Sequence, residues 1–479
     1  MQLLRDACKA YAIDKVFEYK VDRSSKTRYT IVCKVEGCPW RLHGSPIGAS
    51  SICRIKTFND EHTCFGLNHV GHAQASRSYI ASQIAERLKE QPSYRPVDIV
   101  KDIHRDLGIK INYSKALKAR ERANELIYGT HDAAYQALPK YCQDIIASNP
   151  NSVAILEKTP DDKFNRLFIC YGACATGFAY CRPLLGLDGT HLKTKYQGSC
   201  HTCLWLIVGI LLTAIGVDAN GSLFPLAYAV ASAENDENWL WFLNHLRIVL
   251  QDQTTHLTPE NPADSLVFLS DRQKGLIEGV DRLFPESPHG YCLRHLQDNM
   301  HKQFKHPELK TLLWKAARAT TEMEFYQCMK DMGALDPGAI DWLNTMTKPE
   351  HWADLYFKGK RYEHLTSNIA EAFNAKLLLA RQMPILAMLE EIRHQVMDWF
   401  VTRRHSEDLS PGGLVSKVGT EIQELINERA RRYRYRSTTD TWFEIHSQVT
   451  LAEYIVKLDV QTCSCRVWQT KVLLAPLFV

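Results

Sequence analysis

The sequence predicts an α/β fold around a sheet of buried strands, and three observations support this prediction. Two apolar runs each end in an aspartate, RPLLGLD at 182–188 and LVFLSD at 266–271. The intervening run LLTAIGVDANGSLFPLAYAVAS turns at Asp218 to Gly221, which is typical of a β-hairpin. Apolar residues recur at helical spacing in NWLWFLNHLRIVL and GLIEGVDRLF. We therefore expect one α/β core over about residues 165–400.

Length and composition set the limits of this prediction. The 479 residues exceed one ordinary domain and favour three or four units, and an apolar fraction of 45% permits real cores. The net charge of +4, from 58 basic and 54 acidic residues, is too small to indicate nucleic-acid binding by the whole surface. The predicted units are 1–70, a small β unit; 75–130, a helical region; 165–400, the core, with a helical insertion at about 305–365; and 401–479, a helical tail.

Fifteen cysteines, with no apolar signal segment in MQLLRDACKA, predict a reducing intracellular compartment. The apolar stretch from Leu204 to Val217 has fourteen residues, whereas a membrane-spanning helix needs about 20. We interpret it as strand core and expect no membrane association.

The N-terminal region carries four residues with the spacing of metal ligands. Cys33 and Cys38 form one pair, His62 and Cys64 form a second pair, and strand-like segments lie between the pairs. Two such pairs joined by a hairpin can close a tetrahedral zinc site, so we expect one Zn²⁺ here. The alternative is four unligated residues on a small β-unit. Cys53 is interpreted as a buried thiol rather than a ligand.

Residues 78–126 change to helical patterning. The segments YIASQIAERLKE, VDIVKDIHRDL and YSKALKARERANELI are amphipathic, with Gly108 before the last, which suggests a helix-turn-helix. The last segment carries four basic residues that could meet DNA phosphates: Lys115, Lys118, Arg120 and Arg122. A solvated basic face is the equally strong alternative.

Three acids in the core have the contexts of metal ligands. Asp188 and Asp271 each end an apolar strand-like run, and Glu371 lies in the helix-like stretch TSNIAEAFNAKLLLA. Two strand-end aspartates and a helical glutamate are what a two-metal phosphoryl-transfer site requires. Each acid alone would be read as a cap or turn residue. Four other acids are interpreted as turn, cap or surface residues: Asp218, Glu234, Asp236 and Asp281.

The sequence segments around these acids resemble those of the Mutator-like element transposases, a family of cut-and-paste DNA transposases. The matching text spans roughly residues 130 to 400: CRPLLGLDGTHLKTKYQG, LLTAIGVDANGSLFPLAYAVASAENDENWLWFLNHL, FLSDRQKGLIEGVDRLFP, YCLRHLQDN and RYEHLTSNIAEAFN. The resemblance implies a ribonuclease-H-like catalytic core with a helical insertion before the last acid. It also implies that Asp188, Asp271 and Glu371 bind two Mg²⁺ or Mn²⁺ ions.

The same resemblance implies further partners and residues. Cys292 and His295 match a Cys, two residues, His motif of the family, for which a role near the active site and simple packing are equal alternatives. The N-terminal spacing is similar to the zinc finger of Mutator-like and far-red-impaired-response-type proteins, related to the WRKY and GCM folds. Double-stranded DNA is then the partner, as terminal inverted repeats and target DNA. A nuclear location is expected, and a homo-oligomer is allowed.

Two departures from the family pattern stand out. Residues 199–209 interrupt the usual passage from KTKYQG into LLTAIGVD, and we expect this insert to be a lesion or a mis-spliced segment. Cys463, Ser464 and Cys465 open a SWIM-type finger whose second half does not follow, so we expect no zinc there. Upstream, four arginines could contact DNA or lie on a charged helix surface: Arg431, Arg432, Arg434 and Arg436.

Two main functional hypotheses follow from these observations. The first is an active DNA transposase that binds element ends and cuts and joins DNA by two-metal phosphoryl transfer. The second is a domesticated or decayed transposase that binds DNA without catalysis. The intact acids favour the first, whereas the insert and the incomplete finger favour the second. Another ribonuclease-H-like nuclease is a weaker third reading.

Overall fold

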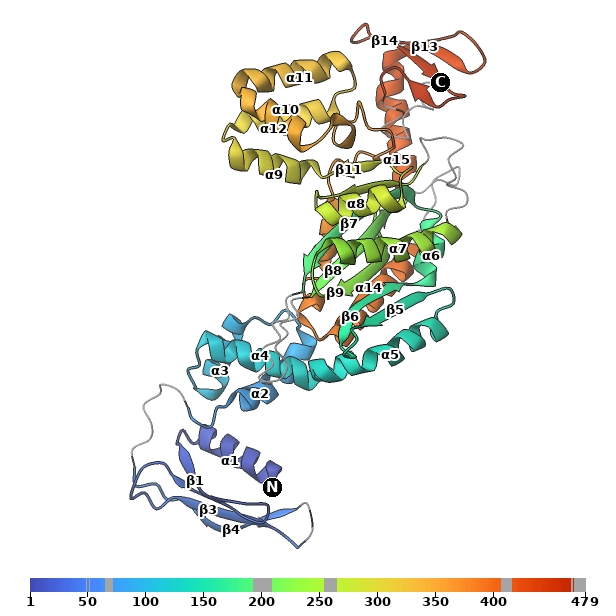
Figure 1. The fold of residues 1–479 in the computed structure, drawn as a ribbon. Helices are drawn as coiled ribbons and strands as arrows, with labels where there is room; N and C mark the ends of the chain where they lie inside the picture. The colour runs from blue at the N-terminus through green and yellow to red at the C-terminus, as the bar shows by residue number, and fades with distance from the viewer. Residues whose placement is uncertain are drawn as a thin grey trace. The chain divides into compact units, whose positions relative to one another are not determined.

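The computed structural model describes residues 1–48, 50, 52–64, 72–192, 209–253, 265–405, 416–466 and 468 (Figure 1). The chain divides into two compact units, Met1–Ala134 with Met383–Ala387, and the remainder from Tyr135 to Val479. Within the described ranges, no helix combines the length and the apolar composition that crossing a bilayer requires. The chain has a mixed α/β fold with several sheets, and a small strand region lies at its N-terminus.

The first unit begins with helix α1 packed on a small antiparallel sheet. The sheet order is β1-β2-β3-β4, and side chains of α1 such as Leu4 and Cys8 share a core with Ile31 and Trp40. Helix α1 is absent from the sequence prediction. The bounds are α1 Gln2–Asp14, β1 Tyr19–Ser24, β2 Tyr29–Cys33, β3 Arg41–Pro46 and β4 Cys53–Asn59.

Three helices follow the sheet where amphipathic patterning predicted them: α2 Arg77–Glu90, α3 Pro96–Leu107 and α4 Tyr113–Tyr128. The Ser76 and Asn112 side chains accept backbone N–H bonds that begin α2 and α4. Helix α3 ends at Gly108, whose φ of 67° suits a residue without Cβ. Their buried residues, including Ile80, Ile99 and Ala116, form a common core.

A mixed seven-stranded sheet organises the second unit, in the order β11-β10-β7-β8-β9-β6-β5. Its strands are β5 Val153–Lys158, β6 Phe164–Cys170, β7 Arg182–His191, β8 Ile210–Val217, β9 Leu223–Ala231, β10 Val267–Ser270 and β11 His289–Tyr291. The predicted hairpin is confirmed, because β8 and β9 pair antiparallel around Asp218, whose Oδ1 accepts the Ser222 amide. Strands β7, β10 and β11 run parallel to one another.

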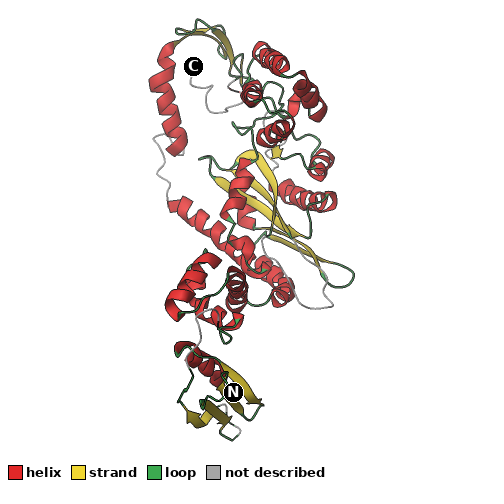
Figure 2. Cartoon of the chain, turned by 90° about the vertical axis from the view of Figure 1, so that its left-hand side faces the viewer, coloured by secondary structure: helices red, strands yellow, loops and turns green. Residues whose placement is uncertain are grey.

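Helices lie on both sides of this sheet (Figure 2). The Cβ positions of Gly186 and Gly189 face opposite sides, because the two residues are three apart on β7. The Gly186 side meets Ile369 of α13, and the Gly189 side meets Glu234 in the connection to α7. The helices of the core are α5 His131–Ser148, α6 Gly172–Phe178, α7 Asp236–Gln253, α8 Lys274–Leu283, α13 Asn368–Lys376 and α14 Ile385–His405.

Helices α9 to α12 occupy most of the sequence between β11 and α13 and form a group of their own (Figure 1). Their common core includes Leu313, Phe325 and Trp352. Their bounds are α9 Leu293–Gln303, α10 Pro307–Arg318, α11 Glu322–Leu335 and α12 Pro337–Met346. Short 3-10 turns follow at Pro349–His351 and Ala380–Gln382. The four helices and the turn at Pro349–His351 therefore precede α13, the helix that carries Glu371.

The tail over 401–479 corrects the helical prediction. After α15 Ser416–Glu424, a π-turn Leu425–Arg429 and a 3-10 turn Ala430–Arg432, the chain forms an antiparallel sheet: β12 Tyr433–Ser437, β13 Trp442–Ser447, β14 Glu453–Lys457 and β15 Thr462–Cys463. The physical reason is composition, because YRYRS, WFEIHS and EYIVK alternate and carry aromatic and β-branched residues that favour strands.

The predicted lesion at 199–209 lies outside the described residues, apart from Gly209. On either side of it the ladder continues, since His191 pairs with Ile210 and the Leu192 amide donates to the Gly209 carbonyl at 2.8 Å. Strands β7 and β8 thus pair up to the last described residues.

Candidate metal centres and nucleic-acid contacts

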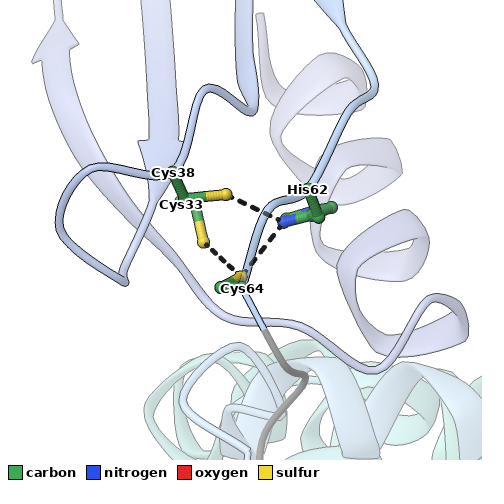
Figure 3. A group of neighbouring side chains, drawn as sticks. All are labelled: Cys33, Cys38, His62 and Cys64. Carbon is green, nitrogen blue, oxygen red and sulfur yellow. Dashed lines mark hydrogen bonds between the residues drawn. The ribbon is translucent and has the colours of Figure 1, made fainter.

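The four predicted zinc ligands meet in the first unit (Figure 3). Cys33 Sγ lies 3.7 Å from Cys64 Sγ, and His62 Nδ1 lies 3.4 Å from Cys38 Sγ and 3.5 Å from Cys64 Sγ. A tetrahedral zinc ion, with bonds of about 2.3 Å to sulfur and about 2.0 Å to nitrogen, separates its ligands by roughly 3.5–3.8 Å. The four side chains, which all lie within 4.8 Å of one another, therefore fit zinc.

Local structure explains why these residues converge. Cys33 ends β2, Gly37 takes a φ of 81° in the turn that brings Cys38 back, and His62 and Cys64 follow β4. The ring of His62 stacks on Trp40 with an interplanar angle of 14°. This packing orients the histidine ring.

The thiols of Cys33 and Cys38 differ in acidity. Burial raises the pKa of Cys33 to about 11. Burial also raises the pKa of Cys38, but hydrogen bonds from the Trp40 and Thr63 backbone outweigh it and lower the pKa to about 6. Cys38 is therefore a thiolate near neutral pH, which is the form that binds zinc.

The two predicted catalytic aspartates lie on neighbouring parallel strands. Asp271 follows the last residue of β10, as predicted, but Asp188 lies inside β7, because pairing with β8 extends that strand to His191. Leu269 of β10 pairs with Gly186 of β7, and the same register carried two residues further sets Asp271 beside Asp188. Adjacent strands lie about 4.8 Å apart. The two carboxylates therefore share one end of the sheet.

Helix α13 brings the third acid to the same place. A Cβ at Gly186 would lie 2.4 Å from Ile369, so only glycine permits this close approach of α13 to β7. The Asn374 Nδ2 atom donates to Asp188 Oδ2 at 2.7 Å, and Ser367 Oγ donates to Glu371 Oε1 at 3.1 Å. We call Asp188, Asp271 and Glu371 the acid centre.

The electrostatics of the acid centre suit a cation. The pKa of Asp188 is raised from 3.8 to about 7, first by burial and then by the negative charges of Asp271, Glu371 and Glu234, while the bond from Asn374 opposes the rise. Carboxylates that repel one another in this way are stabilised by a divalent cation, and carboxylate oxygens are the ligands that Mg²⁺ and Mn²⁺ prefer. The chemistry of the three side chains therefore suits a divalent metal, although the described ligand atoms that lie within 4.8 Å of one another join Glu371 to Cys292 and His295 and not to the two aspartates.

Cys292 and His295 lie against the acid centre. Their ligand atoms and a Glu371 oxygen lie within 4.8 Å of one another. Burial raises the pKa of Cys292, but hydrogen bonds from His295 and Ser367 outweigh it and the pKa is lowered. The bond to Cys292 raises the pKa of His295 to about 9, although burial opposes this. The two opposite shifts therefore favour the charged forms of both side chains, which attract each other beside Glu371.

Three polar residues around the acid centre were missed by the sequence analysis: Asn374, Glu234 and Arg381. Asn374 lies three residues after Glu371, so helical spacing alone could have put it on the same face. Glu234 was assigned to a turn, cap or surface, yet its charge acts on Asp188. Arg381 donates to Thr190 Oγ1 and to the His191 carbonyl, which no local pattern foretells.

The basic residues predicted to bind DNA divide into two groups. On α4, Lys118 and Arg122 are exposed and Lys115 is half-buried, whereas the half-buried Arg120 donates to the Pro92 carbonyl at 3.0 Å and so supports the helical packing. The four tail arginines are all exposed, and they lie on the 3-10 turn and on edge strand β12: Arg431, Arg432, Arg434 and Arg436. The tail arginines therefore form the more accessible set.

Comparison with known families covers two of these regions. Residues 184–299 match the family model described as MULE transposase domain, and residues 1–54 match the model described as MuDR family transposase. The first match includes Asp188, Glu234, Asp271, Cys292 and His295, and the second includes Cys33 and Cys38. No curated protein matches the chain. The two matches, in order along the chain, support a Mutator-like element transposase.

Proposed function

We propose that this protein is a DNA transposase that binds transposon ends and cuts and joins DNA at the acid centre. The observation that carries the proposal is the convergence of Asp188, Asp271 and Glu371, from two parallel strands and a distant helix, on one end of the sheet. The order of strands, hairpin and helices supports a ribonuclease-H-like core. A nuclear location belongs to the same proposal, because chromosomal DNA is the substrate.

In this proposal the acid centre holds two Mg²⁺ or Mn²⁺ ions through its three carboxylates. Bound divalent ions neutralise phosphodiester charge and activate an oxygen nucleophile. Asn374 orients the Asp188 carboxylate, and Ser367 orients that of Glu371. Arg294, with its Nη1 atom 3.6 Å from a Glu371 oxygen and its side chain 58% exposed, is placed to meet the DNA backbone.

The proposed DNA contacts lie outside the acid centre. The zinc-fitted unit at the N-terminus, the exposed Lys118 and Arg122 on α4, and the tail arginines supply basic side chains for phosphates. Since the net charge of the whole chain is only +4, these local sets must provide the electrostatic attraction. Their binding to duplex DNA is expected to weaken steeply as salt rises.

The test separates cleavage from binding. The full chain would be incubated with Mn²⁺ and duplexes taken from the DNA that flanks its own coding locus, alongside Asp188→Asn, Asp271→Asn and Glu371→Gln. The exposed acid Glu286, changed to Gln, is the charge-matched control. We expect each of the three variants to lose at least about 10²-fold in strand cleavage, because each removes a group that stabilises transition-state charge, and to bind DNA as the parent chain does.

Other outcomes would count against the proposal. DNA binding by the parent chain without any cleavage would favour the domesticated, non-catalytic protein. Cleavage that survives Asp188→Asn would show that the acid centre is not the active site.

A further inference from the structure

Helices α9 and α10 carry as much net positive charge as the whole chain. Residues 293–318 hold six Lys and Arg side chains and two acids, a net charge of +4 with histidine counted as neutral. The full sequence, with 58 basic and 54 acidic residues, also has a net charge of +4, so the remainder of the chain is electrically balanced. A local excess of one sign on a balanced protein indicates an anionic partner.

The basic side chains of α10 line a groove beside α11, the helix that packs against it (Figure 1). The groove has a volume of about 800 Å³. Lys310, Trp314 and Arg318 are spaced four residues apart, so they follow one another along one side of α10 at steps of about 6 Å. We call this site the basic groove, and its lining includes Lys310, Trp314, Lys315 and Arg318 of α10 with Glu324 and Cys328 of α11.

The three cations of the basic groove are accessible to an anion. The side chains of Lys310, Lys315 and Arg318 are exposed, and among the described residues no carboxylate oxygen lies within 4.0 Å of their nitrogens. Glu324 also lines the groove, but its Oε2 atom accepts the Thr320 amide at 3.2 Å and the Thr320 hydroxyl at 3.4 Å. Glu324 therefore supports the start of α11 and leaves the three cations unneutralised.

Trp314 orients one of these cations and joins the groove to helix α9. The Arg318 Cζ atom lies 5.0 Å from the centre of the Trp314 ring, a stacking that holds the guanidinium while its N–H groups stay open to a ligand. The indole N–H of Trp314 donates to Gln297 Oε1 at 2.9 Å. Gln297 follows His295 by two residues on α9, and a ring nitrogen of His295 lies within 4.8 Å of a Glu371 oxygen. Helix α9 therefore links the basic groove to the acid centre.

We propose that the basic groove binds the phosphate backbone of duplex DNA on which the acid centre acts. This inference rests on the proposed function and adds a contact surface on α10 to those of the N-terminal unit and the tail. Cations that succeed one another along a helix suit a DNA strand, which presents one charge per about 3.4 Å of its axis. Since Arg318 covers the Trp314 ring, stacking on unpaired bases is disfavoured and the backbone of a duplex is the better ligand.

A second copy of the chain is the competing partner, because the segment 322–346 that forms α11 and α12 holds five acids and one lysine. Three of these acids are engaged within their own helices. Glu324 accepts from Thr320, Asp331 Oδ1 accepts from Gln327 at 2.7 Å, and Asp336 Oδ1 accepts the Gly338 amide at 2.9 Å. This acidic surface therefore offers fewer open charges than a DNA strand does.

The test measures binding of the full chain to labelled duplexes without added Mg²⁺ or Mn²⁺, so it does not depend on cleavage. A triple variant carries Lys310→Gln, Lys315→Gln and Arg318→Gln, and fluorescence anisotropy gives affinities between about 50 and about 200 mM salt. We expect an affinity at least about 10-fold lower, and a slope of log affinity against log salt that is shallower by up to about 2.7, since each phosphate contact contributes about 0.9. The loss should be equal for a duplex from the flanking locus and for a scrambled duplex, because backbone contacts do not read bases.

Two further triple variants are controls. Lys310→Arg, Lys315→Arg and Arg318→Lys together keep the charges and should bind as the parent chain does. Lys140→Gln, Lys158→Gln and Lys163→Gln remove the same net charge from lysines that pair with aspartates, and should change neither the affinity nor the slope. An equal loss in this last variant would assign the effect to net charge and refute the groove.

The outcomes separate this inference from the proposed function. If the parent chain binds duplex DNA and the Gln variant of the groove, folded by circular dichroism, has the same affinity and slope, the basic groove is refuted alone. If the parent chain binds no duplex DNA, the proposed function fails. If the groove variant keeps its DNA affinity but loses a self-association that sedimentation detects in the parent chain, the groove binds a second copy and not DNA.

Discussion

The side chain of Asn374 donates a 2.7 Å hydrogen bond to Asp188, across 186 residues of sequence. Asn374 is 4% exposed and lies one helical turn after Glu371. This one bond therefore ties the helix that presents Glu371 to strand β7, which presents Asp188. Because it also opposes the rise in the Asp188 pKa, it favours the ionised form that a cation needs.

Replacing Asn374 with Ala should weaken cation binding without unfolding the protein. Asp188 would lose its donor, so its pKa would rise further and Mn²⁺ affinity at pH 7 should fall roughly 10-fold. Calorimetric titration checks this, with the exposed Asn299→Ala of α9 as the control. Unchanged affinity in a folded Asn374→Ala protein would contradict the positioning role.

The raised pKa of Asp188 makes cation binding depend on pH near neutrality. Below a pKa of about 7 the metal-free carboxyl holds a proton that Mn²⁺ must displace, so affinity should fall by up to tenfold per pH unit below pH 7 and level off above it. Titrations from pH 5.5 to pH 8.5 measure this directly. In Asp188→Asn this pH dependence should largely disappear, and its persistence would assign the titration to another group.

The raised pKa of Asp188 also predicts how the stability of the metal-free protein depends on pH. An acid whose pKa is raised on folding contributes stability that is fully present below its unfolded value of about 3.8 and is lost as the pH rises through the folded value of about 7. Asp188→Asn should therefore raise the thermal midpoint of the protein without added Mg²⁺ or Mn²⁺, and more at pH 8 than at pH 5. An equal change at both pH values would argue against the shift.

Much of the acid centre could be predicted from sequence, because its parts are local patterns. Apolar runs ending in Asp188 and Asp271 predict strand ends; this is correct for Asp271, whereas β7 continues to His191, and the parallel register still sets the two residues side by side. Glu371 required the family resemblance, since nothing local indicates which face of the sheet α13 covers. Glu234 was assigned to a turn, cap or surface because Asn235 and Asp236 beside it give a helix start, and its effect on Asp188 depends on the packing of this connection against β7.

Most of the fold could also be predicted from the sequence, and the prediction was wrong at strand β12 and helix α1. The run RRYRYR is compatible with a charged helix surface when read alone, and only its pairing with β13 makes it strand β12. Helix α1 is held by contacts of Leu4 and Cys8 with residues of the N-terminal sheet and its following turn, which are distant in sequence. The partner strand of β12 agrees with the strand preference of its alternating tyrosines, whereas α1 depends on contacts that its own sequence does not indicate.

Arg361 is a buried residue whose loss should be costly. It is 2% exposed, forms an ion pair with Asp354 and donates to the Trp352 carbonyl at 3.2 Å. Arg361→Met should lower the free energy of unfolding by about 3 kcal/mol, because one partner of a buried pair is left without compensation. Denaturant unfolding of the full chain checks this against Arg282→Met, an exposed control expected within about 0.5 kcal/mol.

The cluster of Cys292, His295 and Glu371 predicts that Zn²⁺ inhibits DNA cleavage. A thiolate, an imidazole and a carboxylate within 4.8 Å suit Zn²⁺ better than Mg²⁺, and Zn²⁺ bound there would occupy Glu371. Micromolar Zn²⁺ should therefore inhibit Mn²⁺-dependent cleavage, and Cys292→Ser should relieve that inhibition at least about 10-fold. Cys328→Ser, a half-buried thiol on α11, is the control. Inhibition that is equal in both variants would place the inhibitory zinc elsewhere.

Removing one ligand should empty the N-terminal zinc site and destabilise the unit around it. Cys38→Ser takes away the thiol whose pKa of about 6 makes it the readiest ligand, so the full chain should lose one equivalent of zinc by mass spectrometry. Cys53→Ser is the matched control, because that thiol lies in the same unit but contacts Met1 Sδ rather than the four ligands. Zinc should also leave the parent chain on acidification, since each thiolate must then take up a proton. Full zinc content in folded Cys38→Ser, or equal loss from Cys53→Ser, would show that the four side chains do not form the site.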